Sequence, residues 1–285
     1  MSALTEKLKA YPFYVLPHHA ISWLMFKLAR VRFKPFKNLA IAVYTRLNPV
    51  NMREAVEEDK FAYDSLNAFF TRALKPESRP FCEPPAWLCP VDGSVSQAGP
   101  IVQGRIFQAK GHDYSLLELL GGDKELAAQF DNGHFATLYL SPRDYHRIHM
   151  PATGQLRQMR YVPGRLFSVA THTVNQIPRL FARNERCVCA FDTDDGPMVM
   201  VLVGAINVSA IETVWHGLVR ARRIDTHHYA KDALRLQRGE EMGRFNLGST
   251  VIVLGGPNLQ WHPDIRPGRD IRLGQPLASF TPLNR

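Results

Sequence analysis

From about Val91 onward, the chain consists of short runs of β-branched, aliphatic and aromatic residues separated by Gly, Asp, Asn and Pro. Runs of about 4–8 such residues between turn formers predict strands with short connections. The segment DTDDGP at 192–197 predicts a hairpin turn. The predicted strands cover residues 106–109, 135–140, 155–162, 187–192, 198–205, 211–215, 250–254 and 277–280.

Helices are expected mainly before this region. Residues 64–74 (DSLNAFFTRAL) have helical spacing and end at a proline, and shorter helices are predicted at 115–119, with Ser115 as N-cap, and at 124–130. The pattern predicts an α+β fold in which a mainly antiparallel β body follows a helical N-terminal region. We place the boundary between a helical, basic and aromatic region (1–75) and a catalytic α+β domain (76–285) at the proline-rich connector.

The first 47 residues carry most of the net positive charge. The chain has a formal net charge of +9, and this leader has eight Lys or Arg against the single acid Glu6. Such an excess points to an anionic partner, either a lipid surface or nucleic acid. No nucleic-acid-binding motif accompanies it, so we expect no nucleic-acid partner.

Aromatic and aliphatic residues alternate with these charges in the leader. Ile21, Leu24, Met25 and Leu28 follow the spacing of one helix face. The apolar stretch 20–26 is far shorter than the ~20 residues that a spanning helix needs. We therefore expect the leader to lie in the membrane interface, placing the protein peripherally on the cytoplasmic side of the cell membrane. The alternative is an amphipathic helix packed on the body with its charged face outward.

The four cysteines do not form a recognisable motif. Cys82, Cys89, Cys187 and Cys189 have neither CxxC spacing nor the density of a disulfide scaffold. They are expected to be reduced thiols.

Two segments offer acid–base side chains. Asp92 lies in PVDGSVSQ, where an Asp before Gly is also a common turn former. His146 and His149 lie in SPRDYHRIHMP, in a predicted loop after the strand 135–140. Their spacing could suit a metal, but no third ligand is evident and the intervening Arg147 would repel a cation, so no metal site is expected. Imidazoles there could instead act as a base and an acid.

Several other histidines are expected to be surface or packing residues. They occur in short stretches at 18–19, 172 and 227–228.

Gly248 and Ser249 directly precede the predicted strand 250–254. A serine hydroxyl needs a base to become nucleophilic, and Asp92, His149 and Ser249 would supply a relay in that order. The lipase-type GxSxG elbow is absent. The residues alone leave open whether this is a turn, a serine hydrolase acting on a lipid ester, or a chain that presents a reactive hydroxyl at a strained peptide bond.

The segments PVDGSVSQ, AKGHDYSLLELLG, YHRIHMP, LFARNERCV, IETVW and EMGRFNLGSTVI occur in one order between about Phe61 and the C-terminus. In these segments the chain resembles the bacterial-type phosphatidylserine decarboxylases, which are pyruvoyl-dependent, self-processing proenzymes. The basic, aromatic leader is similar to the membrane-associated helices of that family.

The resemblance implies cleavage between Gly248 and Ser249 into a β chain (1–248) and an α chain (249–285), with Ser249 becoming a covalent pyruvoyl group. It implies that His149, oriented by Asp92, activates the Ser249 hydroxyl. The pyruvoyl ketone would form a Schiff base with phosphatidylserine, and loss of CO2 would give phosphatidylethanolamine. His146 is the implied proton donor.

The chain departs from the family pattern at Gly255, where family members commonly carry an aromatic residue. The resemblance gives as partners the substrate, an anionic membrane surface and the two chains of one precursor, and it allows a homodimer. A lipid-ester hydrolase and a non-catalytic basic protein are the alternative hypotheses.

Overall fold

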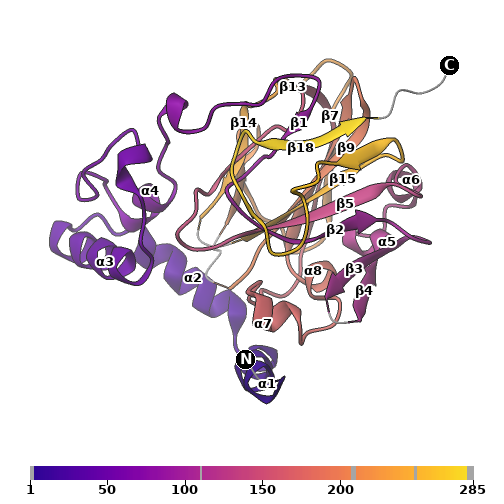
Figure 1. Ribbon diagram of the computed structural model, residues 1–285. Coiled ribbons are helices and arrows are strands. Elements are labelled where there is room, and N and C mark those ends of the chain that lie inside the picture. The colour runs from indigo at the N-terminus through magenta and orange to yellow at the C-terminus, as the bar shows by residue number, and fades with distance from the viewer. Residues whose placement is uncertain (1–2, 110, 207–209, 247–248, 281–285) are drawn as a thin grey trace.

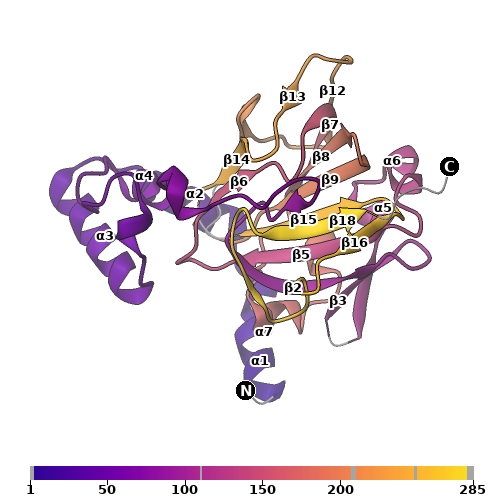
Figure 2. The same ribbon diagram turned by 45° about the horizontal axis from the view of Figure 1, so that its top comes forward.

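The computed structural model describes residues 3–109, 111–206, 210–246 and 249–280. Helices of the leader extend from one side of a β body, which holds most of the later chain (Figures 1 and 2). The α-helices are α1 (Ala3–Ala10), α2 (His18–Ala29), α3 (Lys34–Leu47), α4 (Leu66–Phe70), α5 (Leu116–Leu119), α6 (Lys124–Ala128), α7 (Thr171–Val174) and α8 (Leu180–Arg183). Short 3₁₀ turns cover Tyr11–Tyr14, Met52–Glu54 and Pro76–Ser78.

The principal sheet has nine strands, and its neighbouring strands are antiparallel. Its order is β12-β7-β8-β9-β15-β5-β2-β17, and β13 also pairs with β7. These strands are β2 (Gly93–Pro100), β5 (His134–Leu140), β7 (Gly154–Val162), β8 (Arg186–Thr193), β9 (Gly196–Val203), β12 (Asp225–His228), β13 (Arg235–Leu236), β15 (Ser249–Gly255) and β17 (Asp270–Ile271).

Three smaller sheets complete the body. They have the orders β1-β18-β16, β11-β10-β14-β6 and β3-β4. Their strands are β1 (Trp87–Leu88), β3 (Arg105–Ala109), β4 (His112–Ser115), β6 (Arg147–His149), β10 (Ile211–Thr213), β11 (Gly217–Val219), β14 (Glu241–Phe245), β16 (Leu259–Trp261) and β18 (Pro276–Phe280). The α+β class with a mainly antiparallel sheet is confirmed.

Strand β15 lies inside the principal sheet, between β5 and β9. Every residue of β15 is buried, as expected when both neighbours and both faces are covered. Gly255 at its end has a packing role: a Cβ there would lie 2.2 Å from the Leu259 side chain. Leu259 therefore occupies the space that a larger residue at 255 would need.

The predicted hairpin at 192–197 is confirmed, since Thr193 pairs with Gly196 between β8 and β9. The N-cap at Ser115 is also confirmed, because its hydroxyl accepts a hydrogen bond from the Glu118 amide. The predicted strands recur, although β10 ends at Thr213 rather than at residue 215.

The helix predicted over 64–74 is shorter than expected. Helix α4 ends at Phe70, and beyond it the chain extends so that Leu74 bridges Ala55. The Lys75 amide donates to the Glu54 carbonyl in the same pairing. Tertiary pairing thus replaces the last helical turn.

The loop predicted around the two histidines is partly wrong. Residues 147–149 form β6, which pairs with β14.

The four cysteines are free thiols, as predicted. In the described part of the chain, no helix is both long and apolar enough to cross a bilayer.

Candidate active site

Backbone pairing brings the serine and histidine segments together. Ser249 lies opposite Leu140 across β15 and β5, and the Phe245 amide donates to the His146 carbonyl at 3.1 Å. Strands β5 and β15 are neighbours in the principal sheet, and strands β6 and β14 are neighbours in the four-stranded sheet. The histidine segment and the serine segment therefore both lie where these two sheets are connected. Gly248, the predicted cleavage position, lies outside the described residues.

Ser249 is fully buried at the first position of β15. Its Oγ has no hydrogen-bond partner among the residues that the structure describes. An unpaired buried hydroxyl costs free energy, so such groups deserve a chemical explanation.

His149 is held by both of its ring nitrogens. Nδ1 lies 2.8 Å from the Gly239 carbonyl oxygen, which only accepts, so Nδ1 carries the proton and donates. Nε2 of the neutral ring then accepts from the Tyr145 hydroxyl at 3.1 Å. Burial lowers the pKa of His149, although the Gly239 contact and the charge of Glu241 oppose the change. The side chain is thus a neutral base with its lone pair at Nε2.

His146 has a different environment. Its Nδ1 donates to the Asp144 carbonyl at 2.9 Å, and its ring lies against Phe70 with centroids 4.1 Å apart. Nε2 is buried without a partner in the described structure. Burial lowers the pKa of His146 to about 3, so the ring is neutral with an unused lone pair.

Asp92 is bound by Arg79. Arg79 Nε donates to both carboxylate oxygens, at 2.9 and 3.1 Å, and Nη2 donates to Oδ2 at 2.5 Å. The Leu273 amide donates to Oδ1 at 2.8 Å. Burial alone would lower the pKa of Arg79, but its bonds to Asp92 and Glu54 raise it. Asp92 is therefore a buried carboxylate whose two oxygens accept hydrogen bonds from Arg79 and from the Leu273 amide.

The structure brings the two predicted histidines and Asp92 into one region, but it orients them differently from a simple relay. The charge of Asp92 reaches His149 and opposes the lowering of its pKa. The hydrogen bonds that orient His149 come from Gly239 and Tyr145. The activation of Ser249 by His149 and Asp92 stays a prediction.

Sequence reasoning missed Tyr145, Arg79 and Gly239. Tyr145 lies inside the YHRIHMP segment, so its position beside the histidines was available as a signal. Arg79 lies 13 residues before Asp92 and Gly239 lies 90 residues after His149, and only the tertiary fold places them in contact.

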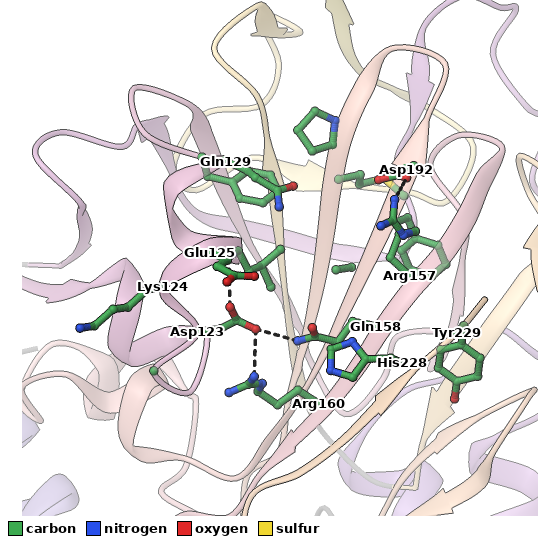
Figure 3. A pocket seen from close by; sticks show the side chains of 17 residues that line it. Asp123, Lys124, Glu125, Gln129, Arg157, Gln158, Arg160, Asp192, His228 and Tyr229 are labelled. Carbon is green, nitrogen blue, oxygen red and sulfur yellow. Dashed lines mark hydrogen bonds and ion pairs between the residues drawn. The ribbon is translucent and has the colours of Figure 1, made fainter. Parts of the chain in front are cut away.

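A cavity of about 560 Å³ adjoins these residues. Asp92 and Tyr145 line it, together with Arg72 and Tyr139. A larger cavity of about 740 Å³ lies elsewhere, between α6 and strands β7 to β9 (Figure 3).

That larger cavity contains none of the predicted catalytic residues. Its carboxylate Asp123 is already bound by Gln158 and Arg160, each at 2.9 Å (Figure 3). Size alone therefore does not identify the active site.

The leader contacts the segment that precedes Ser249. Arg30, the C-cap of α2, donates from Nη2 to Asn246 Oδ1 at 3.0 Å. The same guanidinium lies 3.6 Å from the centroid of the Phe26 ring. The leader is thus linked to the chain three residues before Ser249.

No group of three or more His, Cys, Asp or Glu side chains that could hold a metal ion occurs in the described ranges.

Comparison with known proteins gives consistent matches. A family model described as phosphatidylserine decarboxylase matches residues 66–279, and one described as PSD matches residues 8–47. The phosphatidylserine decarboxylase proenzyme of Pseudomonas entomophila (strain L48) is 56% identical over 272 residues, covering 93% of this chain and 95% of the relative. The proenzyme of Pseudomonas aeruginosa (strain LESB58) is 57% identical over 272 residues, covering 93% and 94%. The chain belongs to the phosphatidylserine decarboxylase family.

Proposed function

We propose that this chain converts phosphatidylserine to phosphatidylethanolamine and CO2, using a pyruvoyl group formed from Ser249 by self-cleavage of the Gly248–Ser249 bond. Family membership supports the reaction. The single structural observation that carries the cofactor proposal is the Ser249 hydroxyl, which is buried and unpaired at the start of β15. A pyruvoyl group would fit there, because it replaces the hydroxymethyl group of Ser249 with a methyl group and so removes this costly hydroxyl, while the former Cα becomes a ketone.

In the proposed self-cleavage, Ser249 Oγ attacks the carbonyl carbon of Gly248, and the amide becomes an ester. β-Elimination then breaks the bond between Oγ and Cβ, leaving a carboxylate on Gly248. The new N-terminal residue becomes the pyruvoyl group when water replaces its nitrogen as ammonia. His149 suits the role of base, because its protonated Nδ1 fixes the lone pair at Nε2.

The pyruvoyl group supplies an electron sink for decarboxylation of the bound amine. The chain's own residues hold and transfer protons. The substrate ammonium must lose a proton before it can react. His146 Nε2 is buried without a partner in the described structure, so it can accept a hydrogen bond from that ammonium. We propose that His146, once it carries a proton, donates that proton to the former α-carbon after CO2 leaves, which keeps the role of proton donor for this residue.

The decisive test measures CO2 release from phosphatidylserine labelled in the serine carboxyl group. Wild type should release label, whereas Ser249→Ala should remain a single chain and release none, because alanine has no hydroxyl to attack or eliminate. Retained CO2 release by the uncleaved variant would refute the proposal. Labelling of Ser249 by a fluorophosphonate, with hydrolysis of a lipid ester, would favour the serine hydrolase instead.

We also propose that the leader holds the enzyme peripherally on an anionic membrane, on its cytoplasmic side. In α3 the exposed residues Phe36, Leu39, Val43 and Leu47 recur with the spacing of one helix face. In α2, Trp23, Leu24 and Leu28 are exposed. Exposed cations accompany them at Lys27, Arg32, Lys34 and Arg46. Such a surface suits the boundary between headgroups and acyl chains.

Flotation with phosphatidylglycerol-containing vesicles tests this proposal. Leu39→Asp/Val43→Asp should weaken vesicle binding strongly, whereas Val102→Asp, at an exposed apolar position of the body, should not. Equal binding by all three proteins would contradict the assignment of the leader as the membrane surface.

A further inference from the structure

Arg72, two residues beyond α4, is a buried cation that forms no ion pair with the residues that the structure describes. Only 5% of the residue is exposed. Its Nε is buried and unpaired, and its guanidinium makes no hydrogen bond or ion pair with any described residue. Its guanidinium carbon lies 5.7 Å from the centroid of the Phe69 ring. Burial lowers the pKa of Arg72, as expected for a charge removed from water, and the charge of Asp92 opposes the change without forming an ion pair.

A buried, unpaired charge is unfavourable in the free protein. Such a feature is expected where a functional requirement overrides local stability. Arg72 therefore calls for an anionic ligand.

The side chain lines the cavity of about 560 Å³ beside the candidate active site. The buried and half-buried carboxylates that line this cavity already have partners, including Glu54, which accepts from Arg79 at 2.8 Å. Asp92 is bound by Arg79, and Asp144 accepts from the Ser141 amide at 2.7 Å. Asp270 lies at the exposed edge of the cavity. None of these carboxylates pairs with Arg72.

The cavity is connected to the candidate catalytic residues through Asp92 and Tyr145. Both line it, and the hydroxyl of Tyr145 is hydrogen-bonded to His149 Nε2. A ligand held by Arg72 would thus share a cavity with Asp92 and with the tyrosine that contacts His149.

We propose that Arg72 binds the phosphodiester of the lipid headgroup and so positions the substrate, an inference that rests on the proposed function. A guanidinium matches phosphate oxygens with two parallel hydrogen bonds. The other anionic group of the substrate is the carboxylate that leaves as CO2. Its charge disappears in the reaction, so an ion pair there would stabilise the ground state more than the transition state. The phosphodiester keeps its charge from substrate to product.

Kinetics and maturation of three variants test the proposal. Arg72→Met removes the charge at similar volume, and Arg72→Lys keeps the charge but lacks the two parallel N–H donors of a guanidinium. Arg143→Met removes a charge from the same cavity at a side chain that is 64% exposed. We expect normal self-cleavage in all three, because no lipid takes part in that step.

For Arg72→Met we expect KM for phosphatidylserine to rise by roughly tenfold or more, the loss expected for one charge-assisted hydrogen bond. The change in kcat should be much smaller. Arg72→Lys should recover part of this loss, and Arg143→Met should change KM by less than about threefold, as expected for an exposed charge. Equal effects of Arg72→Met and Arg143→Met would overturn the proposal, since they would indicate a general electrostatic attraction.

A direct binding measurement distinguishes a failure of this proposal from a failure of the proposed function. Line broadening in ³¹P NMR should show that glycerophosphocholine, which has a phosphodiester but no reactive amine, binds the mature wild type and not Arg72→Met. Binding without any decarboxylase activity would refute the proposed function and leave the site intact. Binding of inorganic phosphate alone, with unchanged lipid kinetics in Arg72→Met, would overturn the headgroup assignment.

The melting temperature of Arg72→Met distinguishes ligand binding from a structural role for Arg72. Replacing an unpaired buried charge with Met should leave the melting temperature unchanged or raise it. A large fall in melting temperature, or failure of the variant to mature, would show that the protein itself uses the charge and would contradict the proposal.

Discussion

The ion pair between Arg79 and Asp92 gives a quantitative prediction. Both side chains are less than a tenth exposed, and three donor–acceptor contacts join them. Arg79→Met would leave the Asp92 carboxylate buried with only the Leu273 amide as a described partner. Removing one partner of such a pair typically costs about 3–5 kcal/mol in the free energy of unfolding. A chain of this size loses roughly 2–4 °C in melting temperature per kcal/mol, so we expect a fall of about 6–20 °C.

The measurement uses the Ser249→Ala background, so that every variant remains one uncleaved chain. Circular dichroism would follow thermal unfolding of Arg79→Met, Asp92→Leu and the double variant. Because the double variant leaves neither charge unpaired, it should be at least about 2 kcal/mol more stable than the two single losses predict by addition. Arg143→Met serves as the exposed control, with a change below about 1 kcal/mol. Additive effects in the cycle, or equal effects of Arg79→Met and the control, would refute the assignment of Asp92 to a buried ion pair.

Three further predictions concern the two proposed catalytic histidines and the leader. His149→Ala should accumulate uncleaved precursor on denaturing gels, and efficient maturation would contradict its role as base. Burial lowers the pKa of His146 from 6.5 to about 3, so its contribution to stability is complete above pH 6.5 and is lost as the pH falls toward 3. In the uncleaved background, the free energy of unfolding should fall more steeply with decreasing pH for the protein that keeps His146 than for His146→Asn. The difference in slope should be up to about 1.4 kcal/mol per pH unit in that range, and parallel pH profiles of the two proteins would contradict this. Removing residues 1–47 should weaken vesicle binding, and wild-type binding should fall with added salt; binding that ignores both changes would contradict a basic membrane surface.

The sequence predicted the β body well because its signal is local. The aliphatic run after Ser249 is buried on both sides in β15, and the turn formers at 192–197 define a two-strand hairpin. The helix over 64–74 was predicted too long, because Leu74 pairs with Ala55. No local pattern reports such a partner.

In the candidate site too, locally encoded features were predicted and tertiary contacts were not. The segments containing Asp92, His146 and His149 were recognisable, and the fold brings them into one region. The partners that determine their chemistry were not predictable, because Arg79 and Gly239 reach them only through tertiary structure. The unpaired state of Arg72 is likewise visible only once burial and every neighbouring group are known. The division at residue 75 stays a prediction.

Intact mass spectrometry of freshly purified wild-type protein tests the central claim most directly. Cleavage between Gly248 and Ser249 predicts two chains of 248 and 37 residues. The smaller chain should have a blocked N-terminus with the mass of a pyruvoyl group in place of Ser249, followed by Thr250. An active preparation that contains only the intact chain of 285 residues, or a small fragment that begins with unmodified serine, would contradict the account.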